Sequence, residues 1–463
     1  MPDLDHRRLS DADAMFLTTE VAAGVPFAPV SIAISEGGHD AEALAHLREV
    51  SARLLPAQRR RIVRDRLSIA LPRWVDVPGF DPEESSIRLS APPGDGSMRA
   101  ILDWAAEWSR IPMDPERPPW RSVTFEGVQL DGRTVEVTVS QNHHAIIDGQ
   151  GATRLGQALL QFEPDGPLPE MPPPVEPDTS TTWARWKEGW ALEAAKVAAN
   201  ARKVGRWTRW AAHDPKAGSA RARDWAGALR RLKVAQGSRA RSPLLVRRSR
   251  AVRFDIVDVD WGAFRAGSKA VGASVNDAFM GALSVALHRY HLEHGVRVPA
   301  LNAAMAINTR REDDPHGGNR VIGVMLPLPL HDDAAIAIKE CRELSRSHRD
   351  DVDLIRLTDA LRAFANRLPT RVAAWGTRRA LSGVDLQISN VQGIPVRYWV
   401  AGVESLGGAS FATGGPGLSM TLISSRGTAV LGVSTCPEAV RDPEHLAQCL
   451  SFGFAEVAAL APA

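Results

Sequence analysis

The sequence predicts an α/β protein of two domains, and three observations lead to this prediction. The chain has 463 residues, a length typical of two domains or of one large domain. Segments with the alternating pattern of β-strands are interspersed with segments that have helical periodicity. A proline-rich connector at residues 167–177 follows the first such region, and the α/β pattern resumes at residue 242, after a long basic segment.

The first domain is placed at residues 1–180. Asp131 and Gly132 between its last two strands are typical of a hairpin turn. The pattern predicts helices at residues 11–19, 40–55 and 98–109, and strands at residues 30–35, 74–77, 121–130 and 133–142.

Residues 181–244 are interpreted as a basic, tryptophan-rich amphipathic linker. A helix is predicted from residue 183 to about residue 212, since Asp214 and Pro215 are a stop signal. Six of the 13 tryptophans lie between residues 183 and 225, and residues 183–250 hold 18 Lys and Arg against 4 Asp and Glu. Such a helix can lie on an anionic membrane surface, or its tryptophans can pack on the protein's own core. Binding to nucleic acid is disfavoured, because the rest of the chain is acidic.

The second domain is placed at residues 245–463. Its clearest helix opens at Ser274 and carries an apolar face that includes Phe279 and Leu283. A hairpin is predicted around Arg426 and Gly427. The other predicted elements are strands at residues 301–307, 321–330 and 384–389, and a helical stretch at residues 333–378.

Composition limits the class of protein. The three cysteines, Cys341, Cys436 and Cys449, are scattered, which argues against a disulfide framework and for a reducing compartment. The N-terminus is polar, and no apolar run approaches the roughly 18 residues that span a bilayer. We therefore expect a soluble or peripheral protein without a signal peptide.

The most informative motif is residues 143–149, which follow the strand at 133–142. Side chains alternate along a strand, so His143 continues the apolar face of Val137 and Val139, whereas His144 continues the polar face. This alternation predicts that His144 faces a polar cavity, where a histidine can accept a proton from an attacking group.

Two other interpretations of this motif stay open, and a third is disfavoured. The two histidines can be a buried, hydrogen-bonded couple, and Asp148 can be the N-cap of a helix at residues 151–160. A metal site is improbable, because neighbouring strand residues point apart and no cysteine or carboxylate lies at zinc-like spacing.

Five elements in order give a resemblance that covers nearly the whole chain. They are residues 9–17 (Leu-Ser-x-x-Asp-x-x-Phe-Leu), residues 117–120 (Arg-Pro-Pro-Trp), residues 143–149 (His-His-x-x-x-Asp-Gly), the pair Asn276-Asp277, and residues 389–393 (Ser-Asn-Val-Gln-Gly). On these elements the chain resembles the bacterial wax ester synthase/acyl-CoA:diacylglycerol acyltransferase family, within the His-His-x-x-x-Asp acyltransferases.

The resemblance implies two chloramphenicol-acetyltransferase-like α/β domains with a substrate tunnel between them. It implies catalytic roles for His143, His144, Asp148 and Gly149, with His144 as the general base and His143 holding the strand end. Asp148 would fix the loop, with Arg310 as a candidate partner. Gly149 would allow the turn and leave room for the acyl chain.

Asn276 is the expected substrate-binding residue, polarising the thioester or positioning the alcohol, or else it is only a first-turn residue of its helix. Arg117 and Trp120 are expected to be structural. The resemblance implies acyl-CoA as a substrate, diacylglycerol or a long-chain alcohol as the acceptor, and neither cofactor nor metal. We expect a cytoplasmic protein attached peripherally to the inner membrane face or to lipid droplets.

The chain departs from the family pattern at residues 306–310 (Ala-Ile-Asn-Thr-Arg), at residues 318–320 (Gly-Asn-Arg) and at Gln392, which stands in place of a proline. These departures put the acceptor preference in doubt. Two other functions stay open: a polyketide- or peptide-associated acyltransferase or condensation-type enzyme, and a lipid-surface protein that has lost turnover.

Overall fold

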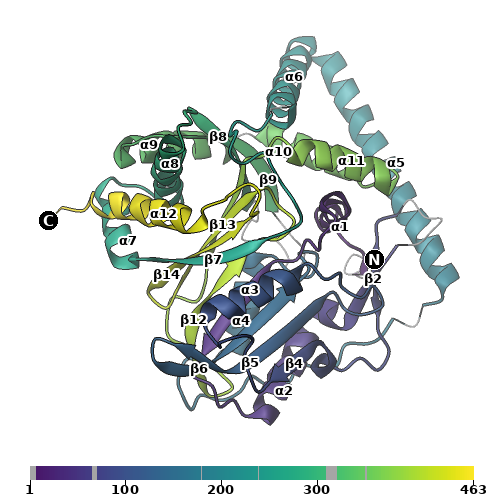
Figure 1. The fold of residues 1–463 in the computed structure, drawn as a ribbon. Helices are drawn as coiled ribbons and strands as arrows, with labels where there is room; N and C mark the ends of the chain where they lie inside the picture. Colours follow the sequence, from purple (N-terminus) through teal and green to yellow (C-terminus); the bar gives the residue numbers. More distant parts are fainter. Residues whose placement is uncertain are drawn as a thin grey trace.

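The computed structural model describes residues 7–64, 70–178, 180–237, 239–308, 321–349 and 352–462. It has two six-stranded sheets with helices packed against them (Figure 1). The predicted α/β class is confirmed.

The first sheet has the strand order β11-β12-β1-β6-β5-β4. Val135, Val137 and Val139 of β6 are buried, as their alternation predicts, and they form a core with Ile101 and other residues of α3. The elements before residue 160 are α1 (Asp11–Ala23), β1 (Val30–Ser35), α2 (Ala41–Leu54), β2 (Arg60–Val63), β3 (Arg73–Asp76), β4 (Ser86–Leu89), α3 (Met98–Ser109), β5 (Trp120–Leu130), β6 (Arg133–Asn142) and α4 (Gly149–Leu159).

The second sheet has the order β7-β14-β13-β10-β8-β9. Its core includes α8, whose residues from Asp277 to Leu287 are all buried. The elements of this half are β7 (Arg253–Val259), α7 (Trp261–Ala270), α8 (Val275–Glu293), β8 (Ala300–Asn308), β9 (Val321–Pro329), α9 (Ala334–Arg349), α10 (Val352–Ala365), α11 (Thr370–Leu381), β10 (Leu386–Gln392), β13 (Leu418–Ser425), β14 (Thr428–Thr435) and α12 (Pro443–Ala458).

Two strands of the second half belong to the first sheet. β11 (Trp399–Val400) and β12 (Val403–Phe411) extend that sheet beyond β1, and β12 pairs antiparallel with β1 along its length. Gly408 permits the close approach, since a Cβ at that position would lie 2.0 Å from the carbonyl oxygen of Ile32. Residues 399–411 of the segment placed at 245–463 thus complete the first sheet, and this hairpin ties the two halves together.

The basic segment forms two helices, α5 (Thr182–His213) and α6 (Pro215–Gly237). The long helix and its end before Pro215 are confirmed, whereas α6 was not expected. Figure 1 shows α5 along the edge of the molecule and α6 returning to α10. Arg8 holds α5 by donating from Nη2 to the carbonyl oxygen of Arg185 at 3.1 Å.

Within the described ranges, no single helix has the length and apolarity needed to cross a bilayer. α7 and α8 together meet that criterion by length and composition alone, with a bend of 102° between them.

Candidate active site

The motif at residues 143–149 begins where β6 ends, and backbone hydrogen bonds fix it on both sides. The N–H of His143 donates to the carbonyl oxygen of Pro119 at 3.0 Å, and the N–H of His144 donates to that of Phe27 at 3.3 Å. The two histidines are thus held between the chain that enters β5 and the chain that enters β1.

His143 is buried and faces the protein interior. Its Nδ1 accepts a hydrogen bond from the N–H of Ala145 at 3.0 Å, which leaves the ring proton on Nε2. That Nε2 lies 3.2 Å from Oε2 of Glu20 on α1. The ring therefore brings the loop close to α1, although the Nε2 and Oε2 atoms lack the geometry of a hydrogen bond.

His144 lies among aromatic rings. Its ring is stacked on that of Phe16, with 4.8 Å between centroids and 23° between planes, and it is tilted against that of Phe27 at 5.5 Å. The residue as a whole is half-buried. Toward Phe16 and Phe27 the ring is therefore covered by apolar groups, where the alternation along β6 predicts a polar cavity.

The surroundings of His144 change its protonation. Desolvation by the protein atoms around the ring, and then the nearby His143, lower the pKa of His144 to about 4. The imidazole is therefore neutral at pH 7, with one of its two ring nitrogens unprotonated.

Asp148 is the N-cap of α4. Its Oδ1 accepts a hydrogen bond from the N–H of Gly151 at 2.7 Å, and its side chain is buried. Arg310, the candidate partner of this carboxylate, lies outside the described residues, as do residues 318–320.

Gly149 brings α4 against the other half of the protein. A Cβ on this residue would lie 3.2 Å from Cγ2 of Val391 in β10. Thr153, one turn later, donates from Oγ1 to the carbonyl oxygen of Gln392 at 3.0 Å. Gln392 stands where the family has a proline, and this hydrogen bond is still possible because its acceptor is the backbone carbonyl oxygen. The histidine loop is therefore seated where the two halves meet.

Asn276 lies in the first turn of α8. Its Nδ2 is 3.8 Å from Sδ of Met280 and 4.0 Å from Sδ of Met305, and sulfur is a weak acceptor. Ser274 and Asp277 supply the capping box of this helix, so Asn276 is not needed as a cap.

Arg117 and Trp120 have the structural contacts expected of them. Arg117 pairs with Glu84 at the surface at 2.7 Å. The indole Nε1 of Trp120 donates to the carbonyl oxygen of Gln58 at 2.8 Å.

Sequence reasoning missed the groups that surround the two histidines. Phe16 lies in the opening motif at residues 9–17, and this motif is the sequence feature that could have identified it. Glu20 lies one helical turn after Phe16, so one face of α1 presents both residues to the histidine loop.

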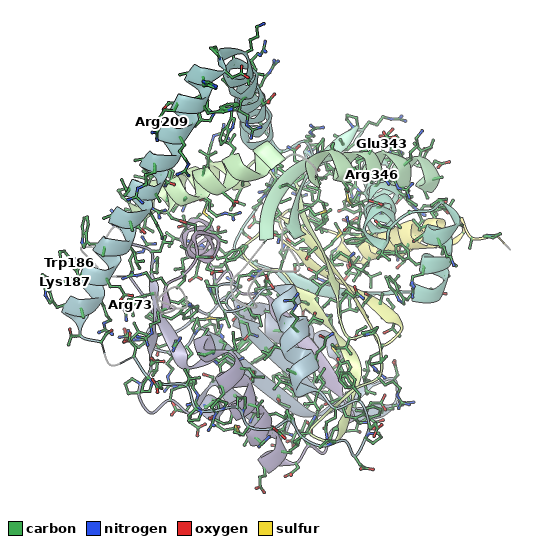
Figure 2. The ribbon with its side chains drawn as sticks, turned by 180° about the vertical axis from the view of Figure 1, so that it is seen from behind. Arg73, Trp186, Lys187, Arg209, Glu343 and Arg346 are labelled. Atoms are coloured by element: carbon green, nitrogen blue, oxygen red, sulfur yellow. The ribbon has the colours of Figure 1, made fainter. Side chains whose placement is uncertain are left out.

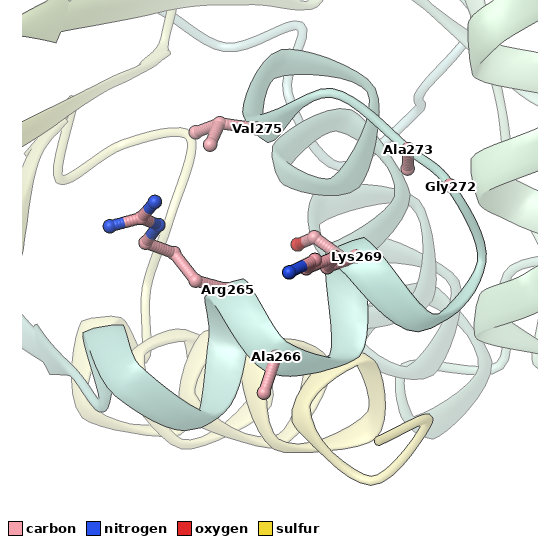
Figure 3. Close-up of a pocket in the computed structure, with 7 residues that line it drawn as sticks. Arg265, Ala266, Lys269, Gly272, Ala273 and Val275 are labelled. Atoms are coloured by element: carbon pink, nitrogen blue, oxygen red, sulfur yellow. The ribbon is translucent and has the colours of Figure 1, made fainter. Parts of the chain in front are cut away.

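A cavity of about 500 Å³ lies at the start of α8 (Figure 3). Arg265 and Lys269 of α7 and Val275 of α8 contribute to its lining. Val275 precedes Asn276. Among the residues that the structure describes, none that lines the cavity belongs to the histidine loop. The two basic side chains suit an anionic group rather than an acyl chain.

Comparisons with known proteins identify the family of this chain. Residues 9–279 match the wax ester synthase/diacylglycerol acyltransferase catalytic domain, and residues 317–458 match the C-terminal domain of the same family. A putative diacylglycerol O-acyltransferase of Mycobacterium tuberculosis is 31% identical over 429 residues, which cover 89% of this chain and 84% of the relative. A probable diacylglycerol O-acyltransferase of the same organism is 26% identical and covers 80% of each chain.

Two solved structures show the same fold. The wax ester synthase/diacylglycerol acyltransferase from Marinobacter aquaeolei superposes with a TM-score of 0.61 at 19% identity, over 97% of this chain and 98% of that one. The first condensation domain of the calcium-dependent antibiotic synthetase superposes with a TM-score of 0.60 at 14% identity, over 99% and 98%. The match to both domains of the family shows that this chain belongs to the wax ester synthase/diacylglycerol acyltransferase family.

Proposed function

We propose that this protein transfers a long-chain fatty acyl group from acyl-CoA to diacylglycerol or to a long-chain alcohol. Membership of the family supports acyl transfer to a lipid acceptor. The observation that carries the finer proposal is the neutral imidazole of His144, a half-buried residue on the loop whose Gly149 lies against β10.

In the proposed reaction, the acceptor hydroxyl oxygen attacks the thioester carbonyl carbon while His144 takes the hydroxyl proton. The tetrahedral intermediate then expels the CoA thiolate, and the protonated imidazole returns the proton to that sulfur. Such proton transfer typically contributes about 10²–10⁴-fold to the rate. The reaction needs no covalent acyl-enzyme, cofactor or metal, since acyl-CoA is itself a substrate.

The low pKa of His144 suits the second step. An imidazolium with a pKa of about 4 is a strong acid relative to a thiol, whose pKa is about 8.5. Return of the proton to the leaving sulfur is therefore downhill. The same low pKa makes His144 a weak base for the first step. The hydroxyl proton is therefore removed only as the oxygen–carbon bond forms.

The neighbouring residues have positioning roles in this proposal. His143 brings the loop close to Glu20, Asp148 fixes the start of α4, and Gly149 lets α4 approach Val391. Asn276 would orient the thioester oxygen or the alcohol, for which its weakly bonded amide is available.

We further propose that residues 183–225 bind an anionic membrane or lipid-droplet surface. Figure 2 shows α5 as an arm at the edge of the molecule, with Trp186 and Lys187 toward one end and Arg209 toward the other. Trp183 is 61% exposed, and further exposed apolar side chains of this segment are Trp190, Val197, Val204, Trp207, Trp210 and Trp225. Exposure of this kind argues against packing of these tryptophans on the core.

A second exposed apolar group lies on α11, and we include it in the proposed lipid-facing surface. Trp375 of α11 is 70% exposed and is followed by the exposed Arg378 and Arg379. α11 packs on α1, where the Nε of Arg378 donates to the carbonyl oxygen of Ala22 at 3.0 Å. The lipid-facing surface would thus lie one helix away from His144, and the protein would be a cytoplasmic, peripheral one.

The experiment that tests the proposal is acyl transfer by purified protein from labelled palmitoyl-CoA, with dioleoylglycerol and hexadecanol as separate acceptors. The proposal expects labelled triacylglycerol, wax ester or both. Activity only with an acyl group tethered to a carrier protein would favour the condensation-type alternative. Binding to vesicles without ester formation from either alcohol would favour a lipid-surface protein without turnover.

A further inference from the structure

A cluster of metal-binding side chains lies away from the histidine loop, where the end of α8 meets the start of α12. His294 is the C-cap of α8, Asp442 is the N-cap of α12, and His445 lies in the first turn of α12. One ligand atom from each of these three residues lies within 4.8 Å of the other two. α8 and α12 are packed side by side in the core (Figure 1), so both ends are anchored.

The hydrogen bonds of His294 leave one ring nitrogen facing a carboxylate. Its Nδ1 lies 2.7 Å from the carbonyl oxygen of Tyr290, so Nδ1 carries a proton and donates it. Its Nε2 lies 3.0 Å from Oδ2 of Asp442. Two lone pairs at this distance repel each other, so either the ring is doubly protonated or Nε2 and Oδ2 share a cation.

Contacts with neighbouring side chains also orient the other two residues, Asp442 and His445, toward the same point. Asp442 makes no capping hydrogen bond to its own helix, and its Oδ1 accepts from the hydroxyl of Tyr290 at 2.7 Å, which turns Oδ2 toward His294. The Nε2 of His445 lies 2.6 Å from Oε2 of Glu293, so Nε2 donates and a neutral ring has its lone pair on Nδ1. A histidine whose second nitrogen donates to a carboxylate or a carbonyl is the usual arrangement in metal sites.

We propose that His294, Asp442 and His445 bind one divalent transition-metal ion of the zinc class. Two imidazole nitrogens and one carboxylate oxygen are a ligand set that zinc accepts, with a fourth position left for water. The 3.0 Å between Nε2 and Oδ2 is close to the roughly 3.3 Å between two ligands of a tetrahedral zinc ion. The ion would join the ends of two core helices, and this role does not depend on acyl transfer.

A neighbouring set of ligands is the competing arrangement. The Sγ of Cys449 lies 3.8 Å from Nε2 of His445 and 3.7 Å from Oε2 of Glu293. However, Glu293 is engaged by Arg289 at 2.9 Å as well as by His445. Cys449 therefore serves as a test of which set binds the ion.

The test is a titration of untagged, full-length protein with zinc, after treatment with a chelator, in competition with a chromophoric zinc indicator. The wild type should bind one equivalent. Tyr290→Phe removes a hydrogen bond to a ligand, and such changes typically weaken metal affinity by about 10–100-fold. His294→Ala and His445→Ala each remove a ligand, so each should weaken zinc affinity by more than this. Cys449→Ser should bind as the wild type does.

His331→Ala is the matched control, because His331 also pairs with a carboxylate, that of Glu340 at 3.0 Å, and belongs to neither set of candidate ligands. Thermal unfolding without zinc checks that each variant folds, and zinc should raise the midpoint of the wild type but not that of His294→Ala. Absence of zinc binding by the wild type would overturn the proposal. Unchanged binding by both histidine variants would also overturn it, as would loss in Cys449→Ser with retention in His294→Ala.

Discussion

The imidazole of His144 is stacked on the phenyl ring of Phe16, with ring centroids 4.8 Å apart. This contact joins two motifs separated by more than a hundred residues of sequence. It also contributes to the dense surroundings that keep the imidazole neutral. The first prediction follows from this contact.

Replacing Phe16 with Leu should raise the pKa of His144 from about 4 toward the ordinary 6.5, because a smaller side chain admits water to the ring. The change is followed by NMR of the imidazole carbon-bound protons during a pH titration. Phe80→Leu is a control, since the ring of Phe80 packs on Trp120 instead. An unaltered His144 titration in Phe16→Leu would contradict the role given to this contact.

The pH dependence of catalysis should reflect the same pKa. Since His144 must be unprotonated to accept the hydroxyl proton, kcat/KM should rise through pH 4 and stay level from about pH 5 to pH 8. If kcat/KM instead rose through about pH 6.5, the imidazole of the free enzyme would have its ordinary pKa, which would contradict this prediction.

Stability should depend on pH through the same group. The pKa of His144 is lower in the folded chain than the ordinary value of the unfolded chain, so the unfolded state binds the proton first as pH falls. The free energy of unfolding should therefore decrease between about pH 6.5 and pH 4, by on the order of 3 kcal/mol. His144→Gln should lack this component in urea unfolding measured over that range.

Gly149→Ala should destabilise the contact between the two halves. The added methyl would meet Val391 at 3.2 Å, and such overpacking typically costs about 1–3 kcal/mol. Val391→Ala in the same chain should recover most of this loss in urea unfolding. Gly205→Ala in α5 is the control, because nothing lies within 4 Å of its added methyl and stability should not fall.

The basic arm should contribute to vesicle binding in a salt-dependent way. Arg206→Ala with Arg209→Ala should weaken binding to vesicles containing anionic lipid by roughly 30-fold, at about 1 kcal/mol for each charge. Cosedimentation with vesicles measures this effect. Ile336→Ser, which removes an exposed apolar side chain from α9, should leave binding unchanged. Equal loss in the control would mean that binding is unspecific.

Elements with strong local patterns could be predicted from the sequence. The bounds of β1, α3 and β6 agree with prediction, because alternation and a serine N-cap define them. Asp131 and Gly132 form the expected turn, both with positive φ. These features depend on neighbours in sequence, which is why the pattern was sufficient.

Features that depend on distant neighbours could not be predicted in this way. β12 contains Gly407 and Gly408, which weaken a strand pattern, and its partner β1 lies more than 370 residues earlier. The motif supplied the histidines, but their contacts with Phe16 and Glu20 come from α1, whose position only the packed structure fixes.

The most direct test of the central claim compares His144→Gln with His143→Gln in a single-turnover transfer from palmitoyl-CoA to the better of the two acceptors. Glutamine keeps the size and polarity of the side chain but cannot take up a proton. The account predicts that His144→Gln loses at least about 10²-fold in rate, whereas His143→Gln loses less and mainly stability. Ester formation by His144→Gln at the wild-type rate would contradict it.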